Sequence, residues 1–168
     1  LNDAVNFLVK AVREGKKIVF VGTKKQAQEI VKKAAIDCGM PYVNERWLGG
    51  TLTNFNVVQR AFKKLERAKI KIASPEFELM KKRDRVSLQK EAEKGERLVG
   101  GMLELNVKPD VLILIGAHDE KNALVEARNM SEKTIALVDT NTNPDLVDFP
   151  IPVNDDATKS ITLFANLF

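Results

Sequence analysis

The stretch RWLGGTLTNF at residues 46–55 joins a cation, an indole and a glycine pair to hydroxyl and amide groups. Arginine can bind phosphate, an indole can stack on a base, and hydroxyl and amide groups can bind sugar and phosphate oxygens. A glycine pair lets a partner approach the main chain closely. The RNA contacts predicted here are Arg46, Trp47, Thr51, Thr53 and Asn54. A Gly-Gly turn with a buried tryptophan and a Thr or Asn cap before a helix would look similar, so spacing alone leaves both interpretations open.

A second candidate site is Gly22-Thr23-Lys24-Lys25, which follows an apolar run. A hydroxyl at a helix N-cap and two cations in the first turn would form an anion site with the free N–H groups. The chain lacks G-x-G-x-x-G and G-x-x-x-x-G-K-[ST], so neither a dinucleotide fingerprint nor a P-loop is present. The same geometry can hold an RNA phosphate, and the family resemblance described below implies that contact for Lys24 and Lys25.

Acidic and amide residues collect after two predicted strands, from Asp139 to Asp145, at Asp148 and in Asn154-Asp155-Asp156. Their oxygens could bind a divalent cation, and the weak candidate ligands are His118, Asp139 and Asp148. Turn formation, with Asp155 capping the last helix, is the favoured interpretation. No cofactor and no catalytic set is predicted.

The middle of the chain is basic: residues 54–95 carry 12 Lys or Arg against 6 Asp or Glu. Residues 1–53 have a net charge of +4 and residues 96–168 a net charge of −6. A soluble helical surface would mix the two signs more evenly, so the excess favours phosphate binding. The predicted RNA contacts in this part are Lys63, Lys64, Arg67, Lys69, Lys71, Lys81, Lys82, Arg83 and Arg85.

The elements that must position these residues alternate between strand and helix. Runs that are apolar throughout, at residues 18–21, 111–115 and 134–138, predict buried strands, and residues 42–43 and 151–153 are weaker candidates. Helical spacing is present in four other segments, at residues 5–12, 27–34, 119–130 and 155–168. Alternation of this kind predicts an α/β fold with a Rossmann-like or flavodoxin-like parallel sheet, covered by helices on both faces.

Residues 54–95 interrupt this alternation. Apolar residues near heptad spacing run from Phe55 to Ile72, and Ser74-Pro75 then gives a stop and a restart. We expect an antiparallel coiled-coil hairpin, inserted at 54–95 into a domain made of residues 1–53 and 96–168. The whole chain has one cysteine, no apolar run long enough for a bilayer and no leader-like start, which predicts a soluble protein without disulfides.

The string NERWLGGTLTNF at Asn44 to Phe55 closely resembles the signature of the S-two family of bacterial-type small-subunit ribosomal proteins. Other strings resemble the same family in the same order: VGTKKQAQEIV at residues 21–31, CGMPYV at 38–43, and LVDTNTNPDLVDFPIPVNDDA at 137–157. The chain departs from the family pattern at Gly116, at His118-Asp119 and at Glu132-Lys133. It begins without methionine and without the family's histidine-bearing start, so we expect it to be the retained part of a longer protein.

The resemblance implies a structural, non-enzymatic component of the small ribosomal subunit, bacterial or organellar, with the same α/β domain and coiled-coil projection. The implied partners are small-subunit ribosomal RNA, neighbouring ribosomal proteins and the mRNA-binding ribosomal protein S-one, with no membrane. The implied location is the ribosome, in the cytoplasm or in an organelle. The alternative is a nucleotide-binding or metal-dependent enzyme on the same sheet, with residues 22–25 for phosphate and Asp139 with His118 for chemistry.

Overall fold

The computed structural model describes residues 1–168 and is built around a five-stranded, fully parallel sheet. The strand order is β2-β1-β3-β4-β5. The strands are β1 (Ile18–Val21), β2 (Tyr42–Val43), β3 (Val111–Leu114), β4 (Lys133–Val138) and β5 (Phe149–Pro152). The order turns back between β1 and β3, which places a topological switch point at the carboxyl ends of these two strands. The predicted α/β class and parallel sheet are confirmed.

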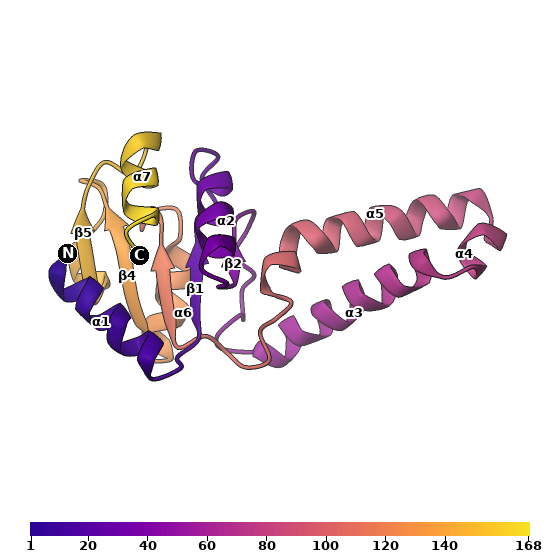
Figure 1. The fold of residues 1–168 in the computed structure, drawn as a ribbon, viewed down its shortest axis with the longest axis horizontal. Coiled ribbons are helices and arrows are strands. Elements are labelled where there is room, and N and C mark those ends of the chain that lie inside the picture. The colour runs from indigo at the N-terminus through magenta and orange to yellow at the C-terminus, as the bar shows by residue number, and fades with distance from the viewer.

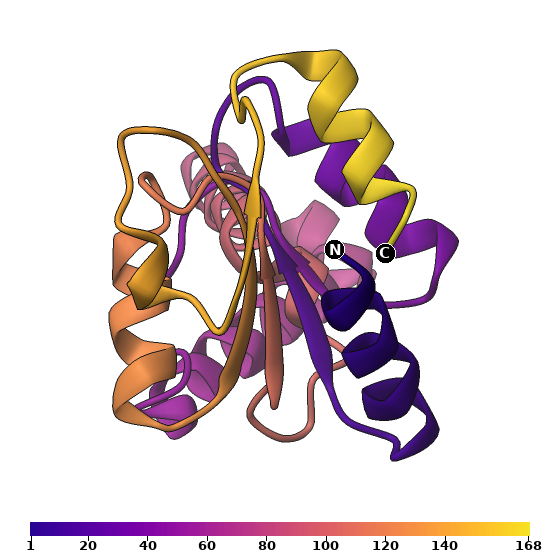
Figure 2. The same ribbon diagram turned by 90° about the vertical axis from the view of Figure 1, so that its left-hand side faces the viewer.

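Helices cover both faces of this sheet (Figure 2). They are α1 (Asn2–Arg13), α2 (Gln28–Asp37), α6 (Lys121–Asn129) and α7 (Thr158–Ala165). Within β1, Ile18 and Phe20 pack with α1, α2 and α7, whereas Val19 and Val21 pack with α6 on the opposite face. Successive side chains of a strand point to opposite faces, so a strand buried on both sides needs the uninterrupted apolar run seen in the sequence.

Between β2 and β3 the chain leaves the sheet and forms two long helices that project together from the α/β domain (Figure 1). The segments are α3 (Phe55–Ala73), α4 (Glu76–Leu79), α5 (Lys82–Val99) and the 3-10 turn η1 (Gly100–Met102). At the base, Phe62 and Leu65 of α3 belong to the same buried cluster as Val99 and the α6 side of the sheet. The two predicted helical limbs are therefore present; coiled-coil packing and the limits of the insertion stay predictions.

Several element boundaries differ from the predicted ones. Helix α2 begins at Gln28, several residues beyond Thr23, and has no side-chain cap. The second limb is interrupted because Met80 and Lys81 are extended. Before α7, the Asn154 side chain accepts N–H bonds from Asp156 (2.9 Å) and Ala157 (3.1 Å), so the cap predicted for Asp155 is wrong. A second 3-10 turn, η2 (Pro144–Leu146), precedes β5. None of the helices is both long and apolar enough to span a bilayer.

Candidate nucleic-acid interface

The glycine-containing loop between β2 and α3 folds inward at its first half. Trp47 is 5% exposed and packs in the cluster beneath the sheet, and Thr51 is buried. The Thr51 hydroxyl donates to the Leu48 carbonyl at 2.6 Å, which satisfies this polar group within the loop itself. The geometry therefore places both residues in supporting positions, and an RNA contact through either would require them to leave the core.

A single carboxylate accepts hydrogen bonds from several residues on the inner side of the loop. Glu126 on α6 accepts hydrogen bonds from the backbone N–H groups of Gly50 (2.7 Å), Leu52 (3.0 Å) and Thr53 (3.4 Å), and from the Trp47 indole (3.3 Å). Gly50 has φ +94°, a conformation that L-residues with side chains rarely adopt. Sequence reasoning missed Glu126 because its partners are backbone groups more than 70 residues away.

The outer half of the loop presents the remaining predicted contacts. Arg46, Thr53 and Asn54 are all exposed. Arg46 makes no ion pair or hydrogen bond within the chain, and Asn54 occupies the N-cap position of α3 without using its side chain as a cap. These groups are free to meet a partner at the root of the hairpin. The predicted set is thus divided between loop scaffold and loop surface.

Helix α3 carries a stripe of exposed cations on the side turned away from α5. Lys63, Arg67 and Lys71 follow one another at helical spacing and face away from the buried Phe62 and Leu65. No ion pair holds any of the three. Arg60 extends the stripe by one turn towards the loop and was missed by the sequence analysis, although its spacing of three from Lys63 signals it. We call Arg60, Lys63, Arg67 and Lys71 the α3 stripe.

Other hairpin cations have partners within the protein. Lys64 pairs with Glu91 at 2.8 Å and Lys69 with Glu96 at 2.6 Å, so both link α3 to α5. Arg85 pairs with Glu78 at 2.9 Å, and its guanidinium lies 6.0 Å from the centre of the Phe77 ring. Surface pairs of this type contribute little stability, and they neutralise charge that would otherwise be available to a phosphate group. Lys81, Lys82 and Arg83 remain exposed and unpaired at the tip.

The corner after β1 differs from the anion site predicted there. Lys24 Nζ contacts Asp155 at 2.6 Å, Asp156 at 2.8 Å and Asp119 at 3.2 Å. Burial opposes the charged ammonium, but its hydrogen bonds to the aspartates outweigh this and hold the pKa of Lys24 above its ordinary value. Lys24 is therefore engaged inside the protein, whereas Lys25 is exposed.

The backbone at the same corner is engaged by an anion of the chain itself. Thr23 N–H donates to Glu120 Oε1 at 2.7 Å, and Glu120 is 2% exposed. Burial of this carboxyl raises its pKa above the ordinary value, although the bond from Thr23 acts in the opposite direction. Because a carboxylate occupies the free N–H group, and α2 starts only at Gln28, the predicted phosphate site at the helix start is not formed in this structure.

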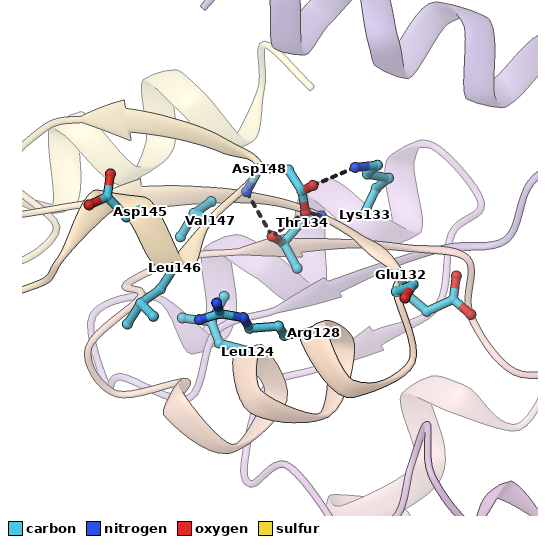
Figure 3. A pocket seen from close by; sticks show the side chains of 10 residues that line it. Leu124, Arg128, Glu132, Lys133, Thr134, Asp145, Leu146, Val147 and Asp148 are labelled. Carbon is cyan, nitrogen blue, oxygen red and sulfur yellow. Dashed lines mark hydrogen bonds and ion pairs between the residues drawn. The ribbon is translucent and has the colours of Figure 1, made fainter.

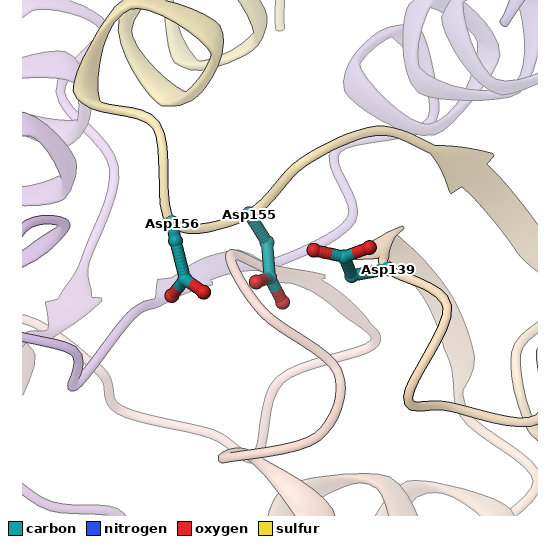
Figure 4. A group of neighbouring side chains, drawn as sticks. All are labelled: Asp139, Asp155 and Asp156. Carbon is teal, nitrogen blue, oxygen red and sulfur yellow. The ribbon is translucent and has the colours of Figure 1, made fainter.

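The three candidate metal ligands do not come together. Asp139 instead lies beside Asp155 and Asp156, with one carboxylate oxygen of each within 4.8 Å of the others (Figure 4). Lys24 already binds two of these carboxylates and supplies the compensating charge. His118 is partly buried, and its Nδ1 atom has no hydrogen-bond partner.

Asp148 belongs to another part of the surface. It accepts from Lys133 Nζ at 2.6 Å and from Thr134 N–H at 3.0 Å (Figure 3). Burial works against the ionised form, but these bonds dominate and lower the pKa of Asp148. It lines a hollow of about 310 Å³ together with residues of α6 and η2, among them Arg128 and Leu146. Its pairing with Lys133 makes Asp148 a structural contact that holds the start of β4 to the start of β5.

Comparison with known proteins identifies similar chains. The family model described as Ribosomal protein S2 matches residues 1–168. Proteins named small ribosomal subunit protein uS2 are similar: that of Aliarcobacter butzleri is 49% identical over 91% of this chain and 58% of its own length. Those of Nitratiruptor and Wolinella succinogenes are 45% and 46% identical, each over 95% of this chain. The chain spans 58 to 60% of the length of these relatives.

Proposed function

The chain belongs to the ribosomal protein S2 family, and from this premise we propose that it is a structural, RNA-binding constituent of the small ribosomal subunit. The α/β domain supplies the scaffold, and the hairpin with the adjoining loop supplies the surface for ribosomal RNA. The observation that supports this most is the α3 stripe, a row of exposed cations without internal partners. Cations in a row suit the regular negative charge of a nucleic-acid backbone.

Within this proposal, the RNA contacts are the α3 stripe, Arg46, Thr53 and Asn54 at its root, and Lys81, Lys82 and Arg83 at its tip. Lys25 is a further exposed candidate, and Lys64, Lys69 and Arg85 would have to give up internal ion pairs to contribute. Trp47 and Thr51 support the contacting loop from inside the protein, and Lys24 is engaged with aspartates elsewhere. Phosphate contacts of this kind fix the position of a protein on RNA without reading its sequence.

The acidic part of the chain supports a second class of partner. Residues 96–168 carry a net charge of −6, which repels RNA and suits contacts with basic proteins. We therefore propose neighbouring small-subunit proteins as partners of this part of the chain, and the attachment of ribosomal protein S-one as the more specific role that the family resemblance implies.

The enzymatic alternative is not favoured. The family is one of ribosomal proteins, and the corner that would bind a nucleotide phosphate is filled by the protein's own carboxylates. Lys24, the residue such an enzyme would use for phosphate, is held by aspartates on other segments. A nucleotide would have to displace these contacts before binding.

Removing three of the four cations of the α3 stripe tests the proposed function. A variant with Lys63→Ala, Arg67→Ala and Lys71→Ala should bind protein-free small-subunit rRNA more weakly than the unmodified chain. Each lost phosphate contact should also reduce the slope of log affinity against log salt by about 0.7 to 0.9. Filter binding over a range of salt concentrations measures both quantities.

A charge-matched control uses Arg13→Ala, Lys33→Ala and Lys159→Ala, which remove exposed cations from α1, α2 and α7 on the other face of the sheet. This variant loses the same net charge and should keep nearly the original slope. Equal losses in both variants would mean that only total charge matters and would overturn the assignment of the α3 stripe.

A further inference from the structure

Glu126 lies behind the proposed RNA-contacting surface, yet it is bonded to four residues of the loop that forms part of this surface. The carboxylate receives the N–H groups of Gly50, Leu52 and Thr53 and the indole N–H of Trp47. It makes no ion pair with a cation. Its charge is therefore stabilised by loop donors alone, an arrangement in which hydrogen bonds to an ionised acceptor are strong.

The loop is shaped to receive this carboxylate. Gly50, with φ +94°, directs its N–H towards Glu126 Oε1, while Leu52 and Thr53 reach Oε2 from the following turn. Neighbouring backbone N–H groups that converge in this way form an anion-binding concavity. An internal anion already occupies this concavity, so the groups of the loop that remain available to an RNA phosphate are those on its outer side, where Arg46 and Asn54 are exposed.

The same contact lies directly before the start of the hairpin. Thr53 N–H donates to Glu126, and α3 begins two residues later at Phe55. The Phe55 ring packs edge-on against the Phe62 ring, with 6.1 Å between the ring centres. Helix α6, which carries Glu126, is itself fixed on the sheet by the buried Ala123 and Ala127. One carboxylate thus connects the α/β domain to the loop that leads directly into the basic helix.

We propose that Glu126 is a positioning residue for RNA binding: its carboxylate holds the loop so that Arg46 and the α3 stripe meet the same RNA surface. This inference rests on the proposed function. It has an unusual electrostatic signature, because removing a negative charge from an RNA-binding protein normally strengthens binding. If Glu126 positions the loop, its removal weakens binding instead.

The test compares Glu126→Gln with Glu104→Gln in the full chain. Glu104 is exposed and makes no hydrogen bond or ion pair, so its replacement removes the same charge without touching the loop. We expect Glu126→Gln to raise the dissociation constant for protein-free small-subunit rRNA about tenfold, and Glu104→Gln to leave it unchanged or lower it. Adding Arg46→Ala should weaken the unmodified protein but have little further effect in Glu126→Gln, since residues acting through one structure are not additive.

Amide hydrogen exchange provides a readout that a general loss of stability would not reproduce. In the folded Glu126→Gln variant, the amides of Gly50 and Leu52 should exchange faster while those of the sheet strands keep their protection. Unchanged loop exchange, or rRNA binding as tight as that of Glu104→Gln, would overturn the proposal.

If Glu126→Gln does not fold, Glu126→Asp, which shortens the side chain by one methylene, is measured in the same way. An unmodified chain that binds no rRNA overturns the proposed function and the positioning role together, whereas loop exchange still decides whether Glu126 holds the loop.

Discussion

At the scale of single residues, the loop at 46–54 contains candidate RNA-binding residues of which some are buried and others are exposed. Trp47 and Thr51 are buried, while Arg46, Thr53 and Asn54 are exposed. An indole in the core contributes apolar burial and one satisfied N–H group, and it cannot stack on a base at the same time. The loop therefore offers fewer residues for the proposed RNA contact than its composition suggests.

Replacement of Trp47 separates packing from RNA contact. Because Trp47 is 5% exposed, Trp47→Ala should lower the free energy of unfolding by about 3 to 5 kcal/mol. Trp47→Phe keeps most of the apolar burial and loses the bond to Glu126, so its cost should be about 1 to 3 kcal/mol. Urea unfolding followed by far-ultraviolet circular dichroism measures both. Near-normal stability combined with lost rRNA binding would restore the stacking interpretation.

The sequence predicted where the cations of the hairpin lie, but it did not predict which carboxylates pair with them. The excess of Lys and Arg in the hairpin is visible in the sequence, and so is the outward spacing of the α3 stripe, including Arg60. What the sequence could not show is that Lys24 meets Asp155, more than 130 residues away, or that Lys64 and Lys69 meet glutamates on the other limb. These pairings depend on which strands are neighbours and on how the two limbs align.

At the scale of elements, the strands were the easiest to predict. Apolar residues at every position mark a strand covered on both faces, and β1 and β3 follow this pattern closely. Helix starts were harder: α2 begins at Gln28 without a side-chain cap, and the turn before α7 uses Asn154 where Asp155 was expected. Asp155 was misassigned because a carboxylate suits a helix start in sequence, while in space it is buried against Lys24.

The junction between the hairpin and the sheet depends on Gly101 in η1. A Cβ atom at this position would lie 2.4 Å from the Tyr42 carbonyl oxygen and 2.7 Å from its ring. Gly101→Ala should therefore push the end of the hairpin away from β2 and destabilise the protein by about 3 kcal/mol. The shift in the urea unfolding midpoint measures this cost.

Gly49 provides the comparison for this prediction. A Cβ atom at Gly49 would lie 4.0 Å from its nearest neighbour, Glu126 Oε1, and the backbone there is outside the left-handed region. Gly49→Ala should change the free energy of unfolding by no more than about 0.5 kcal/mol. Similar costs at the two glycines would show that Gly101 does not set the approach of η1 to β2.

At the scale of the whole molecule, charge and burial are separated. The hairpin segment 54–95 carries a net charge of +6, so the rest of the chain carries a net charge of −2. Most of the large buried side chains belong to the α/β domain and to the base of the hairpin. The distal hairpin contributes Ala68 and Phe77 to the buried set. Stability should thus come mainly from one part of the chain, and attraction to RNA from the other.

Truncation of the hairpin tests this division. Replacing residues 67–92 by a short Gly-Ser turn keeps the basal contacts of Phe62, Leu65 and Val99 and removes a net charge of +4. The truncated protein should still unfold cooperatively. Its free energy of unfolding should depend less steeply on urea concentration, because less surface is exposed on unfolding. Its affinity for protein-free small-subunit rRNA should fall, and the salt dependence of the remaining binding should flatten. Loss of cooperative unfolding would show that the distal hairpin belongs to the folding core, and undiminished rRNA affinity would place the RNA surface on the α/β domain.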